Sequence, residues 1–161
     1  MKKFEIEFKW ALSFTAFNML WLSLEKFLGW HDELIQLHIF YSLLIILPQA
    51  LFYYLALREK KFKYYKGEIN WQQAFLSGGI LSVIIAGLSP ATIYYMNTFL
   101  SPDFIDLAIE RYVVSGGKEA SAKNFHSLEA YIKNAILFNV SIGIVISGVV
   151  GIFIKTKETK N

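Results

Sequence analysis

The longest apolar stretch of the chain runs from Trp71 to Leu100 and predicts a helix that crosses a membrane. A membrane-spanning helix needs about 20 mostly apolar residues, and this stretch exceeds that length. Three other apolar stretches are also long enough, so four transmembrane helices are expected at about residues 10–30, 37–57, 72–100 and 133–154. The pattern therefore predicts an all-α, polytopic membrane protein whose residues 1–161 form a single membrane domain.

Small residues recur at every fourth position in the third and fourth predicted spans. The two rows contain Gly78, Ser82 and Ala86 in the third span, and Gly143, Ser147 and Gly151 in the fourth. Residues four apart lie on one helical face, and small side chains on that face allow two membrane helices to approach closely. We therefore expect these two spans to pack through their small-residue rows, so that added bulk at Gly143 or Ser147 is more damaging than at Val149.

A shorter amphipathic helix is predicted between the third and fourth spans, over about residues 102–115. Its apolar face includes Phe104 and Ala108, and Ser101 is expected to cap its first turn. Such a helix should lie along the membrane surface or cover the end of the bundle rather than cross the bilayer. The helical pattern then resumes near Lys118 and is expected to continue without a break into the fourth span.

The distribution of basic residues predicts the orientation of the spans. Eleven of the 16 lysines and arginines lie in the two termini or in the loop after the second span. Because cytoplasmic segments are enriched in Lys and Arg, both termini and this loop are expected in the cytoplasm.

The composition narrows the class of protein further. Hydrophobic residues make up 55% of the chain and charged residues only 18%, which is more apolar than an ordinary soluble domain. Cysteine is absent, which excludes disulfides and thiolate chemistry. The net charge of +3 comes with a basic, aromatic-rich loop after the second span that suits anionic headgroups. The expected partner is therefore the lipid bilayer and not a nucleic acid.

Glu25 in the first predicted span is the strongest candidate for a functional residue. A carboxylate in hydrocarbon costs a few kcal/mol and marks a functional site by default. Because Glu25 is about one turn from the outer end, its side chain could instead reach the headgroups and serve only as an anchor. In the functional interpretation, Glu25, Asn18, His38 and Gln49 line a ligand site between the helices, and Glu25 and His38 lie close together across the first two spans.

All three histidines fall on the predicted outer side of the membrane. Imidazole groups are suitable ligands for zinc, which makes His31, His38 and His126 weak candidates for a metal site. Their spacing matches no compact metal motif, so they are expected to be scattered, solvated side chains, and neither a metal nor a cofactor is expected. No nucleophile motif or phosphate-binding loop is present either, so the chain is not expected to be an enzyme.

Short motifs along almost the whole chain carry a resemblance to a known family. They are residues 8–12 (FKWAL), 24–26 (LEK), 31–33 (HDE), 55–61 (LALREKK), 89–90 (SP) and 101–104 (SPDF). In type and order they resemble a family of small four-helix bacterial integral membrane proteins catalogued as a domain of unknown function. The resemblance implies a location in the bacterial inner membrane and transfers neither an activity nor functional residues.

Two hypotheses about function follow. The first is a structural or assembly protein without catalytic activity, whose small-residue faces and amphipathic helix bind a second copy of the chain, as a homodimer, or another membrane protein. The alternative is a small oligomeric transporter or ligand-binding membrane protein with its site near Glu25.

Overall fold

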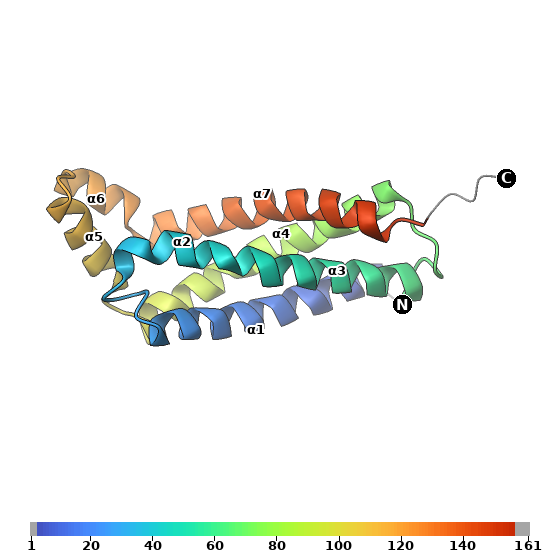
Figure 1. The fold of residues 1–161 in the computed structure, drawn as a ribbon, viewed down its shortest axis with the longest axis horizontal. Coiled ribbons are helices and arrows are strands. Elements are labelled where there is room, and N and C mark those ends of the chain that lie inside the picture. The colour runs from blue at the N-terminus through green and yellow to red at the C-terminus, as the bar shows by residue number, and fades with distance from the viewer. Residues whose placement is uncertain (1–2, 157–161) are drawn as a thin grey trace.

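The computed structural model describes residues 3–156, and every regular element in this range is a helix (Figure 1). This confirms the all-α prediction. The helices are α1 (Glu5–Phe27), α2 (His38–Ser42), α3 (Ile46–Lys63), α4 (Trp71–Tyr95), α5 (Phe104–Val114), α6 (Glu119–Phe125) and α7 (Leu128–Ile154). Short 3₁₀ turns at Ile35–Leu37 and Leu43–Ile45 flank α2, and a π-helical stretch, Met96–Leu100, extends α4.

Three helical stretches in the described residues are long and apolar enough to cross a membrane: Ile35–Lys63, Trp71–Leu100 and Leu128–Ile154. The first predicted span corresponds to α1, which is not among them. Its 23 residues would extend over about 35 Å, enough for a span. Its composition is less apolar because Glu5 and Glu7 lie in its first turn and Glu25 and Lys26 near its last.

The long helices α1, α3, α4 and α7 lie lengthwise beside one another, with α2 leading into α3 (Figure 1). The start of α1 and the end of α7 lie at one end of this arrangement, and α5 and α6 project from the opposite end. The most extensive contact in the fold is between α4 and α7, and the most extensive contact of α1 is with α4. The α4–α7 pair therefore forms the centre on which the other helices pack.

Small residues form the contact between α4 and α7. A Cβ atom added to Gly78 would lie 2.3 Å from Ser147 Oγ, and one added to Gly143 would lie 2.3 Å from Ser82 Oγ. The structure thus places the two predicted rows against each other, with Ala86 buried on the same face of α4. Farther along, Gly151 packs beside Trp71.

Buried polar side chains on the same seam form hydrogen bonds with one another. Tyr53 of α3 donates a 2.9 Å hydrogen bond to Ser82 Oγ, and Ser82 Oγ in turn donates to the carbonyl of Gly78 at 2.9 Å. Gln49 Nε2 lies 3.4 Å from Asn139 Oδ1, which links α3 to α7. These bonds allow polar groups to remain in an otherwise apolar interior.

A buried ion pair joins α1 to α3 at the end of the fold that carries the termini. Lys60 Nζ lies 2.9 Å from Glu7 Oε1 and donates a 3.0 Å hydrogen bond to Glu7 Oε2. The two side chains are only 4% and 3% exposed. Lys60 Nζ also donates to the carbonyl of Lys3 and lies 4.2 Å from the centre of the Tyr64 ring. The ammonium group is therefore surrounded by acceptors, although it is removed from water.

Two local predictions near the other end are wrong. The helix expected to run unbroken from Lys118 is interrupted at His126, and α7 begins at Leu128 because Ser127 caps it by accepting a hydrogen bond from Ala130 N. The amphipathic helix is present as α5, but Ser101 does not cap it; α5 begins at Phe104. The Ser101 side chain has another partner, described below.

Candidate functional site

Glu25 lies in the last turn of α1 and is 1% exposed. The interpretation that it reaches the headgroups as an anchor is therefore wrong. The physical reason is the path of the chain after α1, which turns back at Gly29, where φ is +77°. Glycine adopts this left-handed conformation without steric cost. The turn carries Trp30 N to within 3.0 Å of the Glu25 carbonyl and places His31 over the end of the helix.

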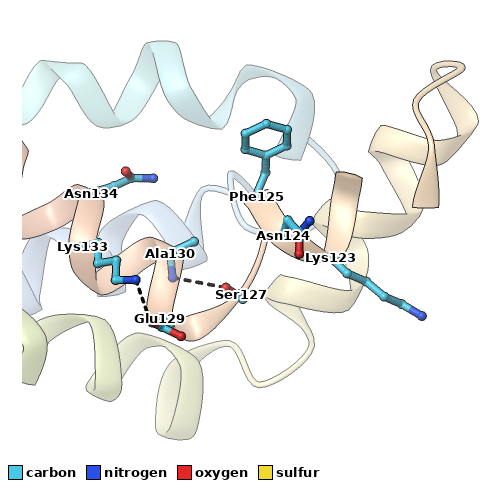
Figure 2. A pocket seen from close by; sticks show the side chains of 8 residues that line it. All are labelled: Lys123, Asn124, Phe125, Ser127, Glu129, Ala130, Lys133 and Asn134. Carbon is cyan, nitrogen blue, oxygen red and sulfur yellow. Dashed lines mark hydrogen bonds and ion pairs between the residues drawn. The ribbon is translucent and has the colours of Figure 1, made fainter. Parts of the chain in front are cut away.

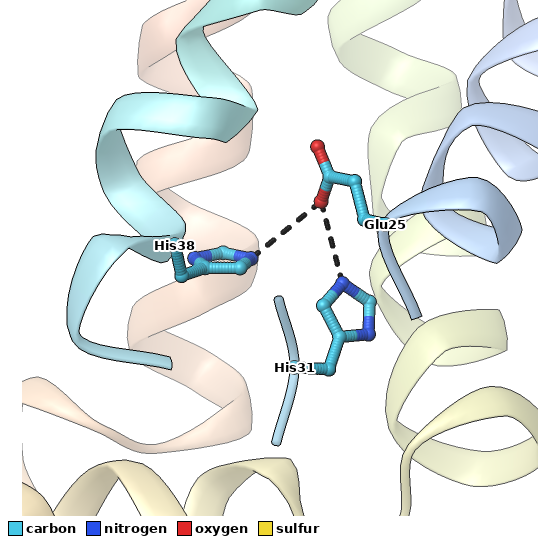
Figure 3. A group of neighbouring side chains, drawn as sticks. All are labelled: Glu25, His31 and His38. Atoms are coloured by element: carbon cyan, nitrogen blue, oxygen red, sulfur yellow. Dashed lines mark hydrogen bonds and ion pairs between the residues drawn. The ribbon is translucent and has the colours of Figure 1, made fainter. Parts of the chain in front are cut away.

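Two imidazole rings face the Glu25 carboxylate (Figure 3). His31 Nε2 lies 3.3 Å, and His38 Nε2 3.6 Å, from Glu25 Oε2. The expected proximity of Glu25 and His38 is thus present, and His31 joins them from the turn after α1. Ser42 donates a 3.0 Å hydrogen bond to the same carboxylate oxygen, and Trp21 Nε1 donates to the other oxygen at 2.6 Å.

The segment after α4 completes the surroundings of His31. Ser101 Oγ lies 2.8 Å from His31 Nδ1, and both residues are buried. The π-helical stretch delivers Ser101 to this position, since Ser101 N bonds the carbonyl of Met96 at 2.7 Å. Such wide turns are frequent at functional sites. Phe104, near the start of α5, packs against both imidazoles, with ring centroids 5.3 Å from His31 and 4.9 Å from His38.

The cluster of Glu25, His31 and His38 lacks a permanent positive charge. Both ion-pair contacts of Glu25 are with histidines, and no lysine or arginine pairs with it in the part of the chain that the structure describes. The neighbouring Lys26 pairs instead with Asp32, at 2.7 Å. A buried carboxylate requires a compensating charge or proton, so positive charge must come from protonation or from a bound cation.

A family model described as a protein of unknown function (DUF4199) matches residues 9–156. The chain belongs to this family. The match confirms the resemblance found in the sequence motifs, and it extends from the start of α1 to the end of α7. No curated protein and no solved structure matches the chain.

The fold does not bring all the predicted site residues together. Asn18 lies seven residues before Glu25, or about 10 Å along α1. Gln49 lies about 16 Å beyond His38 along its helical segment and pairs with Asn139. His126, beyond α6, has its Nδ1 2.8 Å from the Tyr131 hydroxyl, and burial lowers the pKa of this imidazole.

Other residues of the site around Glu25 carried a weaker signal in the sequence. Ser42 follows His38 by four residues, and Trp21 precedes Glu25 by four, so helical spacing could have included both. The expectation that the histidines are scattered and solvated is wrong for His31, which is 0% exposed, and for His38, which is 21% exposed. No local pattern reveals the contact of Ser101 with His31.

An open pocket elsewhere in the DUF4199 fold lies at the junction of α6 and α7 (Figure 2). Its polar lining includes Lys123 and Lys133, which pair with Glu119 and Glu129 at 2.7 and 2.5 Å. All four side chains are more than half exposed. Solvated pairs one helical turn apart are common on helix surfaces, so the cluster around Glu25 is the better candidate for a functional site.

Proposed function

We propose that this protein is an integral protein of the bacterial inner membrane, with four spans and both termini in the cytoplasm, and that it binds a cation at the outer end of its helices. No catalytic activity is proposed. The observation that carries this function is the buried Glu25 carboxylate, which faces two imidazoles and, among residues 3–156, no permanently charged partner.

The outer surface of the long helices supports membrane insertion. Large apolar side chains that are more than half exposed point outward from all of them. They include Leu20 of α1, Leu47 and Leu51 of α3, Leu76 and Val83 of α4, and Leu137, Val145 and Phe153 of α7. Such a surface suits lipid and would be a liability in water. α1 also carries exposed apolar side chains such as Leu20, and it packs lengthwise on α4, so we include it as the fourth span.

Cysteine labelling tests this topology, because the natural chain contains no cysteine. In intact spheroplasts, a membrane-impermeant thiol reagent should label Ser115→Cys, in the turn between α5 and α6, but not Phe4→Cys, before α1. The reason is the concentration of basic residues at the termini and after α3. Both positions should be labelled once the membrane is opened. A three-span arrangement would expose Phe4→Cys to the reagent from outside and would contradict the proposal.

The surfaces proposed for assembly with a second chain already have partners within this chain. Within the described residues, the small-residue rows of α4 and α7 face each other, and Phe104 on the buried face of α5 covers the histidines. A homodimer or a complex with another membrane protein would need different surfaces and stays a prediction, as does transport. Cation binding is favoured because it uses a buried charge that packing alone leaves uncompensated.

A panel of cations tests the proposed function directly. Full-length protein in detergent, stripped with a chelator, should gain thermal stability with at least one member of a panel of Na⁺, K⁺, Mg²⁺, Ca²⁺, Mn²⁺, Co²⁺ and Zn²⁺. A ligand that binds only the folded state raises the unfolding temperature. The Glu25→Gln variant should not respond to that cation, because the amide supplies no compensating negative charge. An equal response of both proteins, or none from the natural protein, would contradict cation binding.

A further inference from the structure

We infer that the cation is a divalent transition-metal ion of the zinc class, held by Glu25 Oε2, His31 Nε2 and His38 Nε2; the inference rests on the proposed function and names its ligand. The three residues come from the end of α1, the turn after it and the start of α2. One ligand atom from each lies within 4.8 Å of the other two.

The distances between the ligand atoms suit a tetrahedral ion. With bonds of 2.0–2.1 Å, two ligands of a tetrahedral zinc ion lie about 3.3–3.4 Å apart. Glu25 Oε2 is 3.3 Å from His31 Nε2 and 3.6 Å from His38 Nε2. Two edges of the coordination shell are therefore already near their final length. The third edge, between the two imidazole nitrogens, is within 4.8 Å and would shorten when the ion binds.

The chemistry of the ligands selects the class of metal. Imidazole nitrogens suit zinc, copper, iron and nickel, whereas Ca²⁺ and Mg²⁺ prefer shells made of oxygen. Two histidines and one glutamate are three protein ligands, a set that leaves one position of a tetrahedral ion for water or another small ligand. A divalent ion would also supply the positive charge that the Glu25 carboxylate lacks, and with two neutral imidazoles it would leave the site with a net charge of plus one.

Contacts behind the ligands hold them in place. Ser101 Oγ lies 2.8 Å from His31 Nδ1, so Nδ1 can donate a proton to the hydroxyl while Nε2 presents its lone pair to the metal. Trp21 Nε1 donates to Glu25 Oε1 and leaves Oε2 directed at the histidines. Partners of this kind orient metal ligands and fix the tautomer of a histidine.

Ser42 links two of the ligand atoms. Its hydroxyl donates a 3.0 Å hydrogen bond to Glu25 Oε2 and lies 3.2 Å from His38 Nε2, where the direction of the hydrogen bond depends on the tautomer of the ring. The two ligand atoms therefore already share one small polar partner, and a metal ion bonded to both would replace it. His38, the most exposed of the three ligands, gives the ion a route in from the outer end.

Titration with Zn²⁺ and Co²⁺ tests the inference on purified full-length protein in detergent. We expect one ion per chain, and the visible absorption of tetrahedral Co²⁺, which Zn²⁺ should then abolish. Because His38 is partly exposed, His38→Gln should fold and yet bind Zn²⁺ more than 100-fold more weakly, since it removes a ligand. Ser101→Ala, which acts through His31, should weaken binding about 10- to 100-fold. His126→Gln is the matched control and should bind as the natural protein does.

The outcomes separate this inference from the proposed function. If Na⁺, Ca²⁺ or another member of the panel stabilises the protein through Glu25 while Zn²⁺ and Co²⁺ do not bind, the metal assignment is overturned and cation binding stands. If no cation acts, both are overturned. Equal loss of Zn²⁺ affinity in His38→Gln and His126→Gln, or no loss in either, would also overturn the assignment, because the ion would then bind elsewhere.

Discussion

Replacing Gly143 with alanine should destabilise the protein by about 1–3 kcal/mol, the usual cost of overpacking a filled interior. The added Cβ would lie 2.3 Å from Ser82 Oγ and 2.4 Å from the Tyr53 hydroxyl. Neither atom can easily move away. Tyr53 is buried and its hydroxyl donates a hydrogen bond to Ser82, whose own hydroxyl donates to the carbonyl of Gly78 one turn earlier in α4. The helices α4 and α7 must therefore separate.

Gly87→Ala is the matched control for this change. It lies on α4 with open space around its Cβ position, so alanine should be neutral or slightly stabilising through its higher helix propensity. Thermal unfolding in detergent would measure both. Leucine should have a larger effect than alanine at Gly143. Gly143→Leu should lower the unfolding temperature far more than Val149→Leu, because Val149 lies on the exposed side of α7. Equal unfolding temperatures for Gly143→Ala and Gly87→Ala would show that the contact between α4 and α7 is not as close as described.

Replacing Lys60 with methionine should cost about 3–5 kcal/mol, the cost of breaking a buried ion pair on one side. The substitution retains most of the apolar stem of the side chain but leaves Glu7 with an uncompensated charge away from water. Because Glu7 belongs to α1 and Lys60 to α3, the loss should appear as easier separation of these helices, measured by denaturant unfolding or by protease cleavage near residue 30.

Restoring neutrality should recover most of this stability. The double variant Glu7→Gln with Lys60→Met should be more stable than Lys60→Met alone, because no buried charge then lacks a partner. Lys63→Met serves as the surface control, since Lys63 is 60% exposed and its partner Glu59 keeps a second ion pair, with Lys9. A double variant no more stable than the single variant would mean that the loss comes from packing and not from the charge on Glu7.

The sequence was sufficient to identify the long helices α1, α3, α4 and α7, the amphipathic helix α5 and the contact between α4 and α7. These follow from local periodicity, because residues such as Gly78 and Ser82 lie on one face whatever the rest of the fold does. The helix boundaries did not follow from periodicity alone. The apolar stretch predicted that the fourth span begins at about residue 133, whereas α7 begins at Leu128, because the Ser127 side chain caps it.

The site was only partly predictable for a physical reason. Glu25 and His38 could be paired because each lies on the polar face of an apolar helix. The burial of Glu25 could not be read from its depth, since it depends on the turn at Gly29 that folds His31 over it. The contact between His31 and Ser101 joins residues 70 positions apart, and no local pattern encodes such a contact.

The packing of α1 on α4 has a consequence for biosynthesis. The ribosome makes α1 first, but its main neighbour lies more than 40 residues farther along the chain. In the proposed four-span topology, α1 enters the bilayer before its main neighbour has been made, although it is less apolar than its companions. The later helical stretches, which are long and apolar enough to cross a membrane, then supply that neighbour. Ser101, which follows α4, would reach His31 only at this stage, so the proposed metal site would be completed after the helices that carry its ligands have been made.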